Sequence, residues 1–379
     1  MLIRSNKLFD GRVLRPNTDV RIEDGRICEL GEAIAPRAGE PVLDARGGLL
    51  SPGFIDLHIH GIHGSDTMQA GDAVRKMAAW LPRHGVTAFA PTTMAASLAD
   101  TKAALACVAD AIDHAPGARV LGCHLEGPFL NPARKGAQPG PFMLPPTRAN
   151  YDAIVGTHAG AVKLLTLAPE IPGAEVLIRA LAGHVYLAAG HTDATYEQLA
   201  QAVNWGISQV THLFNGMNPL NHRAPGVPGA ALTLPALRVQ LIADLMHLHP
   251  ATLQLAWRAK GPDGCILITD AMEATDLPDG EYRLGANRVF VEGGAARLKE
   301  GNLAGSTLTM ERAVRNMYES VGVPLEEALR MATANPADAI GRKDLGVIAP
   351  GARADITLLD EQLRVVWTMV GGDEVYSCR

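Results

Sequence analysis

The chain has 379 residues, 47% of them hydrophobic, and this length predicts one large domain of roughly 250–300 residues with a smaller one beside it. The formal net charge of −6 at pH 7 argues against a surface that binds nucleic acid or anionic membranes. No apolar run reaches the roughly 20 residues of a membrane span, the N-terminus lacks the apolar region of a signal peptide, and the five cysteines contain no CxxC pair, so we expect a cytoplasmic protein with free thiols.

The first 50 residues predict a small β-rich unit. Apolar and polar residues alternate over residues 2–9 and 18–31, and Asp24-Gly25 is a hairpin signal within the second stretch. The end of the chain, residues 346–379, shows short strands of the same kind. The simplest interpretation is one small β-sandwich domain assembled from both chain ends, residues 1–50 and 346–379.

Residues 51–345 alternate between strand and helix patterns. Eight runs have the continuous hydrophobicity of strands buried on both faces, and they begin at Gly53, Thr87, Arg119, Val162, Val185, Gln209, Val239 and Cys265. Helical patterns lie between them, for example at 72–84, at 97–114 and after Thr195, where Gln198 completes a capping-box pattern. Eight strand–helix units in series predict an α/β fold, a (β/α)8 TIM-like barrel, with an open doubly wound sheet as the alternative. A further β-type segment, residues 281–305, interrupts the pattern after the eighth strand.

Polar residues follow several of these strands at their C-terminal ends, where the active sites of such barrels lie. His58 and His60 are two residues apart in a strand, so their side chains point the same way. Further ligand-type residues end four other strands, at Glu126, His191, His212 and Asp270. Imidazoles and carboxylates that converge in one cup predict a divalent-metal site.

Other candidate ligands are less informative. His124 also ends a strand, where it either joins the ligands or supports Glu126. Lys163 is of the residue type that, once carboxylated, bridges two metals in some barrel hydrolases, but it stands at the start of its strand and therefore at the wrong end of the barrel. Four histidines lie on helices or loops without evident partners, and we interpret them as surface or core residues: His84, His114, His158 and His184.

Seven segments, in order along the chain, resemble the amidohydrolase superfamily and, within it, the family of N-acetylglucosamine-6-phosphate deacetylases. They are PGFIDLHIHG from Pro52, HLEGPFLNPARKGAQ from His124, GHTDAT from Gly190, THLFNGMNPLNHRAPG from Thr211, ADLMH from Ala243, ITDAM from Ile268 and LAGSTLTM from Leu303. The HxH pair alone indicates only the superfamily, whereas HLEGPF, GHT and THLFNGM together are specific to the family.

The resemblance implies a barrel with a small β-sandwich and assigns roles to individual residues. It places metal ligands at Glu126, His191 and His212, and the catalytic acid/base at Asp270. Substrate contacts are implied at Ala137, Gln138, Asn215, Gly216, Arg223, His247 and the backbone of Leu303, Ala304 and Gly305. Family members are homodimers, and Arg223 is expected to reach the neighbouring subunit's active site as a bidentate partner of the substrate phosphate.

The chain also departs from the family pattern. Some members lack the HxH pair and hold one metal, whereas His58 and His60 are both present here, so one or two divalent ions are expected. Zinc is the first expectation, with iron, cobalt or manganese as alternatives. Three residues differ from those common in the family: Gln138 for His, Gly216 for Ala and Leu245 for Gly. We expect them to tune contacts with the carbonyl and the sugar without changing the reaction.

The implied reaction is hydrolysis of the acetamide of N-acetyl-D-glucosamine 6-phosphate. Asp270 would take a proton from a metal-activated water and return it to the departing amine. Another amidohydrolase, acting on a different N-acetylated amino sugar or on a cyclic amide, would use the same metal cup and leave Arg223 as a structural or surface residue. A non-catalytic sensor of metal or sugar phosphate would have no need of Asp270.

Overall fold

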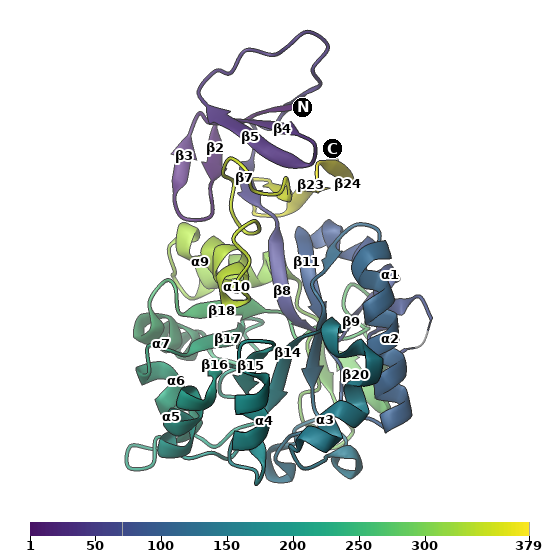
Figure 1. Ribbon diagram of the computed structural model, residues 1–379. Helices are drawn as coiled ribbons and strands as arrows, with labels where there is room; N and C mark the ends of the chain where they lie inside the picture. Colours follow the sequence, from purple (N-terminus) through teal and green to yellow (C-terminus); the bar gives the residue numbers. More distant parts are fainter. Residues whose placement is uncertain (70, 379) are drawn as a thin grey trace.

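The computed structural model describes residues 1–69 and 71–378. Figure 1 shows a small β-rich unit, which carries both chain termini, above a larger α/β unit. Among the described residues, no helix combines the length and the apolar character needed to cross a membrane. The two units are joined where β7 (Leu49–Pro52) of the small unit leads through Gly53 into β8 (Phe54–Ile59) of the large one.

Parallel strands form the centre of the larger unit and follow one another in space as they do in sequence. One sheet has the order β12-β11-β8 and a second the order β13-β14-β15-β16-β17-β18. Isolated parallel bridges join the two sheets, Thr92 with His124 and Ile59 with Ala271. This sequential order is not that of a doubly wound sheet and is consistent with a TIM-type barrel. The remaining strands are β11 (Val86–Pro91), β12 (Arg119–Val120), β13 (Cys123–Glu126), β14 (Val162–Leu167), β15 (Tyr186–Ala189), β16 (Ile207–Val210), β17 (Arg238–Ile242) and β18 (Cys265–Ile268).

Helices connect these strands, and the predicted helix boundaries are confirmed where caps marked them. The side chain of Ser97 caps the helix at 98–114, and Thr195 with Gln198 forms the predicted capping box. The first helix continues as a 3-10 turn, Leu81–His84, and ends at Gly85 with a φ of 73°, which favours glycine. The helices are α1 (Ala73–Trp80), α2 (Leu98–His114), α3 (Arg148–Val155), α4 (Ala174–Leu181), α5 (Tyr196–Trp205), α6 (Gly226–Thr233), α7 (Pro250–Lys260), α8 (Met310–Arg315), α9 (Leu325–Ala332) and α10 (Ala334–Ala339).

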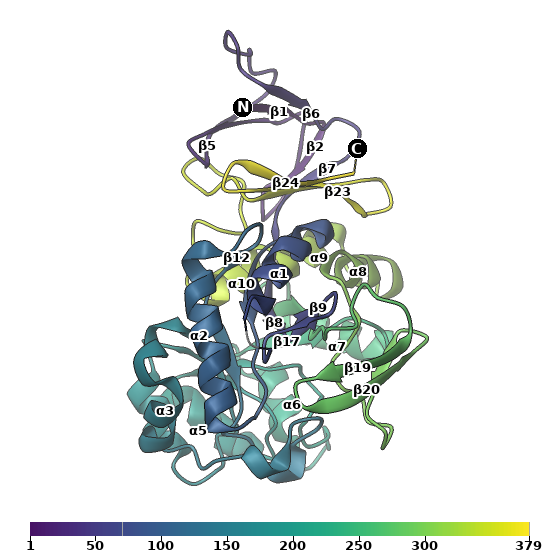
Figure 2. The same ribbon diagram turned by 90° about the vertical axis from the view of Figure 1, so that its right-hand side faces the viewer.

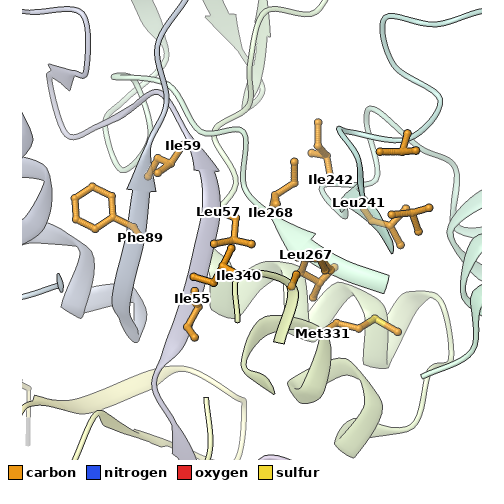
Figure 3. Packing of buried hydrophobic residues seen from close by; sticks show 14 of the residues in the cluster. Ile55, Leu57, Ile59, Phe89, Leu241, Ile242, Leu267, Ile268, Met331 and Ile340 are labelled. Carbon is orange, nitrogen blue, oxygen red and sulfur yellow. The ribbon is translucent and has the colours of Figure 1, made fainter. Parts of the chain in front are cut away.

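Alternation along β8 separates the hydrophobic core from the polar face of the same strand. Ile55, Leu57 and Ile59 are buried in the main hydrophobic cluster, and Figure 3 shows Leu57 beside Ile340, directly after α10. Since successive strand residues face opposite ways, the polar residues of β8 and its end point to the other face of the sheet. These residues are Asp56, His58 and His60.

Two sheets form the small unit, and both chain ends contribute to its core. One sheet has the order β5-β4-β1-β6 and the other β24-β23-β22-β7-β2-β3. A single hydrophobic cluster combines Val20 and Ile22 with Ile356 and Trp367, as a β-sandwich requires. The strand pattern predicted for residues 2–9 forms two short strands, β1 in the first sheet and β2 in the second. The predicted hairpin at Asp24-Gly25 is confirmed, because it joins the antiparallel strands β4 and β5. The strands are β1 (Leu2–Arg4), β2 (Lys7–Phe9), β3 (Leu14–Pro16), β4 (Asp19–Glu23), β5 (Arg26–Gly31), β6 (Val42–Asp44), β22 (Ile356–Leu359), β23 (Val365–Val370) and β24 (Asp373–Ser377).

The segment after the eighth strand forms an antiparallel sheet of its own, β19 (Gly280–Leu284), β20 (Asn287–Glu292) and β21 (Ala295–Arg297). We call residues 280–305 the insert. Figure 2 shows β19 and β20 at the side of the larger unit. The Gly285 N–H donates to Asp66 of the short pair β9 (Gly61–Ile62) and β10 (Ser65–Asp66), and the Asn287 side chain donates to the Ala137 carbonyl. The insert is therefore anchored to two loops at the C-terminal ends of the parallel strands.

Candidate metal centre and active site

Six of the predicted site residues lie together at the C-terminal ends of the parallel strands. His58, His60 and Glu126 belong to or directly follow β8 and β13. The other three each lie two residues beyond a strand and have left-handed backbones, with φ of 47° at His191, 29° at His212 and 50° at Asp270. Such backbones cost about 1–3 kcal/mol each outside glycine. Three strands thus end in a strained residue at this site.

The Glu126 carboxylate lies at the centre of the cluster, between two pairs of imidazoles. Oε1 is 3.1 Å from Nε2 of His212 and 3.3 Å from Nε2 of His191. Oε2 is 3.4 Å from Nε2 of His60 and 3.6 Å from Nε2 of His58. Each carboxylate oxygen therefore faces one histidine pair.

Main-chain carbonyl groups fix the orientation of three of these imidazoles. Nδ1 of His60, His191 and His212 lies 3.2, 3.0 and 3.1 Å from a carbonyl oxygen. Since a carbonyl only accepts, each Nδ1 carries the hydrogen, and Nε2 is left to face the centre of the cluster. This is the arrangement that orients metal-binding histidines in proteins. The acceptors are the carbonyls of Thr92, Arg134 and Asn215.

The cluster is buried, and its two carboxylates make positive charge favourable there. Oδ1 of Asp270 lies 3.2 Å from Nε2 of both His58 and His60. Burial opposes the protonated histidines, but Glu126 and Asp270 raise the pKa of His58 well above its usual value and that of His60 to about 9. Burial also opposes the charged carboxylates, yet His58, His191 and His212 hold the pKa of Glu126 below its ordinary value. His58 and His60 do the same for the pKa of Asp270. Two ionised carboxylates in a buried cup need a cation, either imidazolium or a metal ion.

The donor set fits a divalent metal ion. Two groups of three ligand atoms each lie within 4.8 Å of one another, one formed by Glu126, His191 and His212 and the other by Glu126, His58 and His60. Imidazole nitrogens with a carboxylate oxygen are the ligands of catalytic zinc and of related ions. Glu126 is the one residue that belongs to both of these groups.

His124 and Lys163 lie outside this ligand set. Nδ1 of His124 faces the Thr92 hydroxyl at 3.2 Å and Nε2 faces the Thr166 hydroxyl at 2.7 Å, so both ring nitrogens have protein partners. The His124 ring packs edge-on against that of His58, with 4.6 Å between centroids. His124 therefore supports the cluster by packing against His58. Lys163 lies near the start of β14, where its ammonium group is 5.2 Å from the Tyr186 ring.

A cavity of about 400 Å³ opens over the metal cluster. Seven of the predicted substrate residues line it, namely Ala137, Gln138, Asn215, Gly216, His247, Leu303 and Gly305. Ala304 lies beside them but is buried in the small hydrophobic core of the insert. Arg223 is exposed on the loop before α6 and is not among the residues that line the cavity.

Gln138 has protein partners at both ends of its amide. Its Nε2 donates to Oε2 of Glu126 at 2.7 Å, and its Oε1 accepts from the Ala95 N–H at 2.8 Å. The side chain is almost fully buried. Gln138 therefore ties Glu126 to the chain that follows β11.

His247 and the two other departures from the family pattern, Leu245 and Gly216, have a geometric context. Nδ1 of His247 lies 2.7 Å from Oδ2 of Asp244, and although burial opposes protonation, the hydrogen bond and charge of Asp244 raise the pKa of His247. Leu245 has a φ of 67°, a backbone that glycine adopts without strain. A Cβ on Gly216 would lie 2.9 Å from Nδ1 of His191, so a larger residue requires a local shift.

Several lining residues escaped the sequence prediction. Met94 follows β11, and Leu284, Arg297, Gly301 and Asn302 come from the insert. The sequence did contain a signal for them, because the insert interrupts the barrel pattern directly after a strand's C-terminal end. Segments at those ends build the active sites of such barrels.

Comparison with known proteins shows the family to which this chain belongs. The amidohydrolase family pattern matches residues 49–375. The N-acetylglucosamine-6-phosphate deacetylase of Lysinibacillus sphaericus is 38% identical, covering 98% of this chain and 97% of its own. The N-acetylgalactosamine-6-phosphate deacetylase of Escherichia coli O157:H7 is also 38% identical, covering 97% of each chain. A mutant N-acetyl-D-glucosamine-6-phosphate deacetylase of Mycobacterium smegmatis, solved in complex with N-acetyl-D-glucosamine-6-phosphate, superposes with a TM-score of 0.93 at 33% identity, covering 100% of this chain and 99% of its own. The chain belongs to the amidohydrolase family.

Proposed function

We propose that the protein hydrolyses the acetamide of N-acetyl-D-glucosamine 6-phosphate to D-glucosamine 6-phosphate and acetate, in amino-sugar catabolism or recycling. The observation that carries this proposal is the buried Glu126, His191 and His212 cluster, with Asp270 beside it, at the base of a cavity of about 400 Å³. Relatives that match nearly the whole chain are named for this activity, and one was solved with that sugar phosphate.

Asp270 is the residue that moves protons in the proposed reaction. A divalent ion, when bound, supplies a water of lowered pKa and polarises the acetyl carbonyl. Asp270 lines the cavity, and its carboxylate takes a proton from the attacking water. The same carboxyl group then gives the proton to the amide nitrogen, because an amine leaves readily only when protonated. Asn215, Gly216 and His247 lie around the cavity to orient the sugar.

Five residues are proposed as metal ligands. Glu126, His191 and His212 would hold one ion, and His58 and His60 with Glu126 a second. Zinc is the proposed metal, with iron, cobalt or manganese as alternatives, because such ligands accept all of these ions.

We further infer that the two parallel sheets close into a (β/α)8 barrel over residues 51–345, with residues 1–50 and 346–379 as the sandwich domain. The protein is proposed to be a cytoplasmic homodimer in which Arg223 reaches the substrate phosphate in the other subunit. The support for this role is that Arg223 is exposed and lies off the lining of its own cavity.

N-acetyl-D-galactosamine 6-phosphate is the second candidate substrate. The relative named for that activity is as identical to this chain as the one named for the glucosamine epimer, 38% in both cases. Overall identity therefore does not separate the two epimers.

Amine release with and without the substrate phosphate tests the proposal. The metal-reconstituted wild type and Arg223→Ala are assayed on N-acetylglucosamine 6-phosphate, N-acetylgalactosamine 6-phosphate and N-acetylglucosamine. We expect the wild type to prefer the phosphorylated glucosamine derivative, and the variant to lose most of that preference, because a charged hydrogen bond contributes roughly tenfold or more to binding. Equal turnover of phosphorylated and free sugar, or of neither, would contradict the phosphosugar assignment.

A further inference from the structure

The insert brings a cation into the cavity from the same chain. Among the described residues that line the cavity, Arg297 is the one arginine or lysine. Arg297 is the last residue of β21, which lies outside the βα units. His247 lines the same cavity, and Arg297 is close enough to lower the pKa of that imidazole against the larger effect of Asp244. Two groups able to carry positive charge thus share one region of the cavity.

Arg297 is held on a rigid hairpin. Its backbone pairs with Phe290 of β20 and forms an antiparallel bridge with Leu303. Its Nη1 donates to the Gly301 carbonyl at 2.9 Å, and the turn between them is closed by a Leu298 carbonyl that accepts from the Gly301 N–H at 2.9 Å. One donor of the guanidinium is therefore engaged in placing it, and the side chain is otherwise exposed to solvent at the cavity.

The charge distribution of the cavity indicates where an anion would lie. Two carboxyl groups, those of Glu126 and Asp270, line the cavity beside the histidine cluster, so a phosphate is expected to lie away from them. Arg297 lies among the residues that the insert adds to the lining, with Asn302 and Leu303. A guanidinium presents paired donors that match phosphate oxygens, and a terminal phosphate carries roughly −1.5 to −2 charges at neutral pH.

We propose that Arg297 is a substrate-binding residue that contacts the phosphate of the phosphosugar from within the same subunit, together with His247. This inference rests on the proposed function and adds a specificity determinant to it. The insert then selects phosphorylated sugars, while the strand-end residues carry out the chemistry. Arg223 of the second subunit would contribute a separate contact to the same group.

Kinetics on phosphorylated and free sugar test the role of Arg297. Wild type, Arg297→Ala, Arg297→Lys and the control Arg288→Ala are assayed on N-acetylglucosamine 6-phosphate and N-acetylglucosamine. Arg288 is exposed on the neighbouring strand β20, pairs with Glu281 and does not line the cavity. We expect kcat/KM of Arg297→Ala to fall about 10- to 100-fold on the phosphorylated sugar, mainly through KM, and to stay unchanged on the free sugar. Arg297→Lys should keep part of the preference, since lysine retains the charge without the paired donors.

Calorimetric binding of the products separates this role from a structural one. Arg297→Ala should weaken binding of glucosamine 6-phosphate about 10- to 100-fold and leave binding of glucosamine unchanged. If the wild type prefers the phosphorylated sugar and Arg297→Ala keeps that preference, or loses activity on both sugars alike, the inference about Arg297 is wrong and the proposed function stands. If the wild type itself shows no preference for the phosphorylated sugar, the proposed function fails.

Discussion

Asp270 illustrates how a single residue can be either a ligand or a proton carrier. Its Oδ1 lies 3.2 Å from Nε2 of both His58 and His60, which places it within reach of a metal held by that pair. It also lines the cavity, which a purely structural carboxylate would not do. The three residues Glu126, His191 and His212 would hold an ion without Asp270 and would leave a coordination position for water, as a catalytic site requires.

Replacing Asp270 by Asn distinguishes these roles. The amide cannot accept a proton from water, so we expect kcat to fall by about 10²- to 10⁴-fold. Metal content, measured by mass spectrometry after dialysis, should equal that of wild type. Asp279→Asn, an exposed aspartate in the loop before β19, serves as the control and should change neither quantity. Loss of metal in Asp270→Asn would identify Asp270 as a ligand.

Gln138 is expected to act through Glu126. Its amide holds Oε2 of Glu126 at 2.7 Å and is itself held by the Ala95 N–H. Gln138→Leu should therefore weaken metal affinity about 10- to 100-fold, as loss of such outer contacts does in metal sites. Metal titration of the apo protein measures this effect without reference to turnover. A matched control is Gln69→Leu, which removes a similar glutamine–carboxylate bond, to Glu273, and should leave affinity unchanged. Unchanged affinity in Gln138→Leu would leave Gln138 as a direct substrate contact.

The sequence identifies site residues when position along a strand determines their direction. His58 and His60 could be paired because residues two apart share a face, and Glu126 because it ends a strand. Gln138 and Arg297 are different, since their placement depends on how a loop and an inserted hairpin fold back over the ends of the parallel strands. No periodicity in the sequence encodes that return path.

At the scale of elements, the parallel strands and the capped helices follow from local physics. Continuous apolar runs predicted the strands, and the Thr195 and Gln198 side chains satisfy the free N–H groups that begin α5. The third predicted strand is interrupted at Gly122, which has a φ of 116°. Its first part, β12, pairs with β11, and its second part, β13, pairs with β14. The continuous apolar sequence around Gly122 does not predict this interruption.

The expectation that four histidines lack partners is wrong for His84 and for His114, whose Nδ1 lies 2.8 Å from the Asp110 carbonyl oxygen. His84 has partners, because Nδ1 lies 3.0 Å from Glu311 at the start of α8 and Nε2 lies 3.4 Å from Asp276. Glu311 is more than 200 residues away in the sequence, so no local pattern could reveal the pair. The contact links the 3-10 turn after α1 to α8.

The His84 contact makes part of the stability depend on pH. Burial opposes protonation of His84, but the hydrogen bond and charge of Glu311 with the charge of Asp276 raise its pKa above 6.5. The stabilisation is therefore fully present below the unfolded-state pKa and is lost as pH rises through the folded-state pKa. His84→Gln should lower the free energy of unfolding by about 1 kcal/mol near pH 6 and by less near pH 9.

Urea unfolding of wild type and His84→Gln across this pH range measures the difference. His184→Gln is the control, because His184 is an exposed histidine in the loop before β15. A difference that is constant with pH would mean that the His84 charge contributes nothing and that only packing is lost.

At the scale of the whole molecule, the site depends on strands that are far apart in the chain. The proposed ligands and the proposed acid/base come from the ends of β8, β13, β15, β16 and β18. The small unit is connected directly to these strands, because β7 pairs with β22 near the C-terminus and continues into β8. Trp367 and Leu50 share the core of that unit, so both chain ends support the strand that carries His58.

A metal ion bound across these strand ends should stabilise the fold as well as serve the reaction. An ion that binds only the folded state contributes about 2.7 kcal/mol at a free concentration 100 times its Kd. We therefore expect a chelator to lower the thermal midpoint of wild type and added zinc to restore it. Glu126→Gln, which weakens the ligand shared by both groups, should show a much smaller response. Asp193→Asn, an exposed carboxylate near His191 that pairs with Arg134, should respond like wild type. Equal midpoints for wild type with chelator and with zinc would mean that no ion binds at this cluster, because binding to the folded state alone must raise its stability.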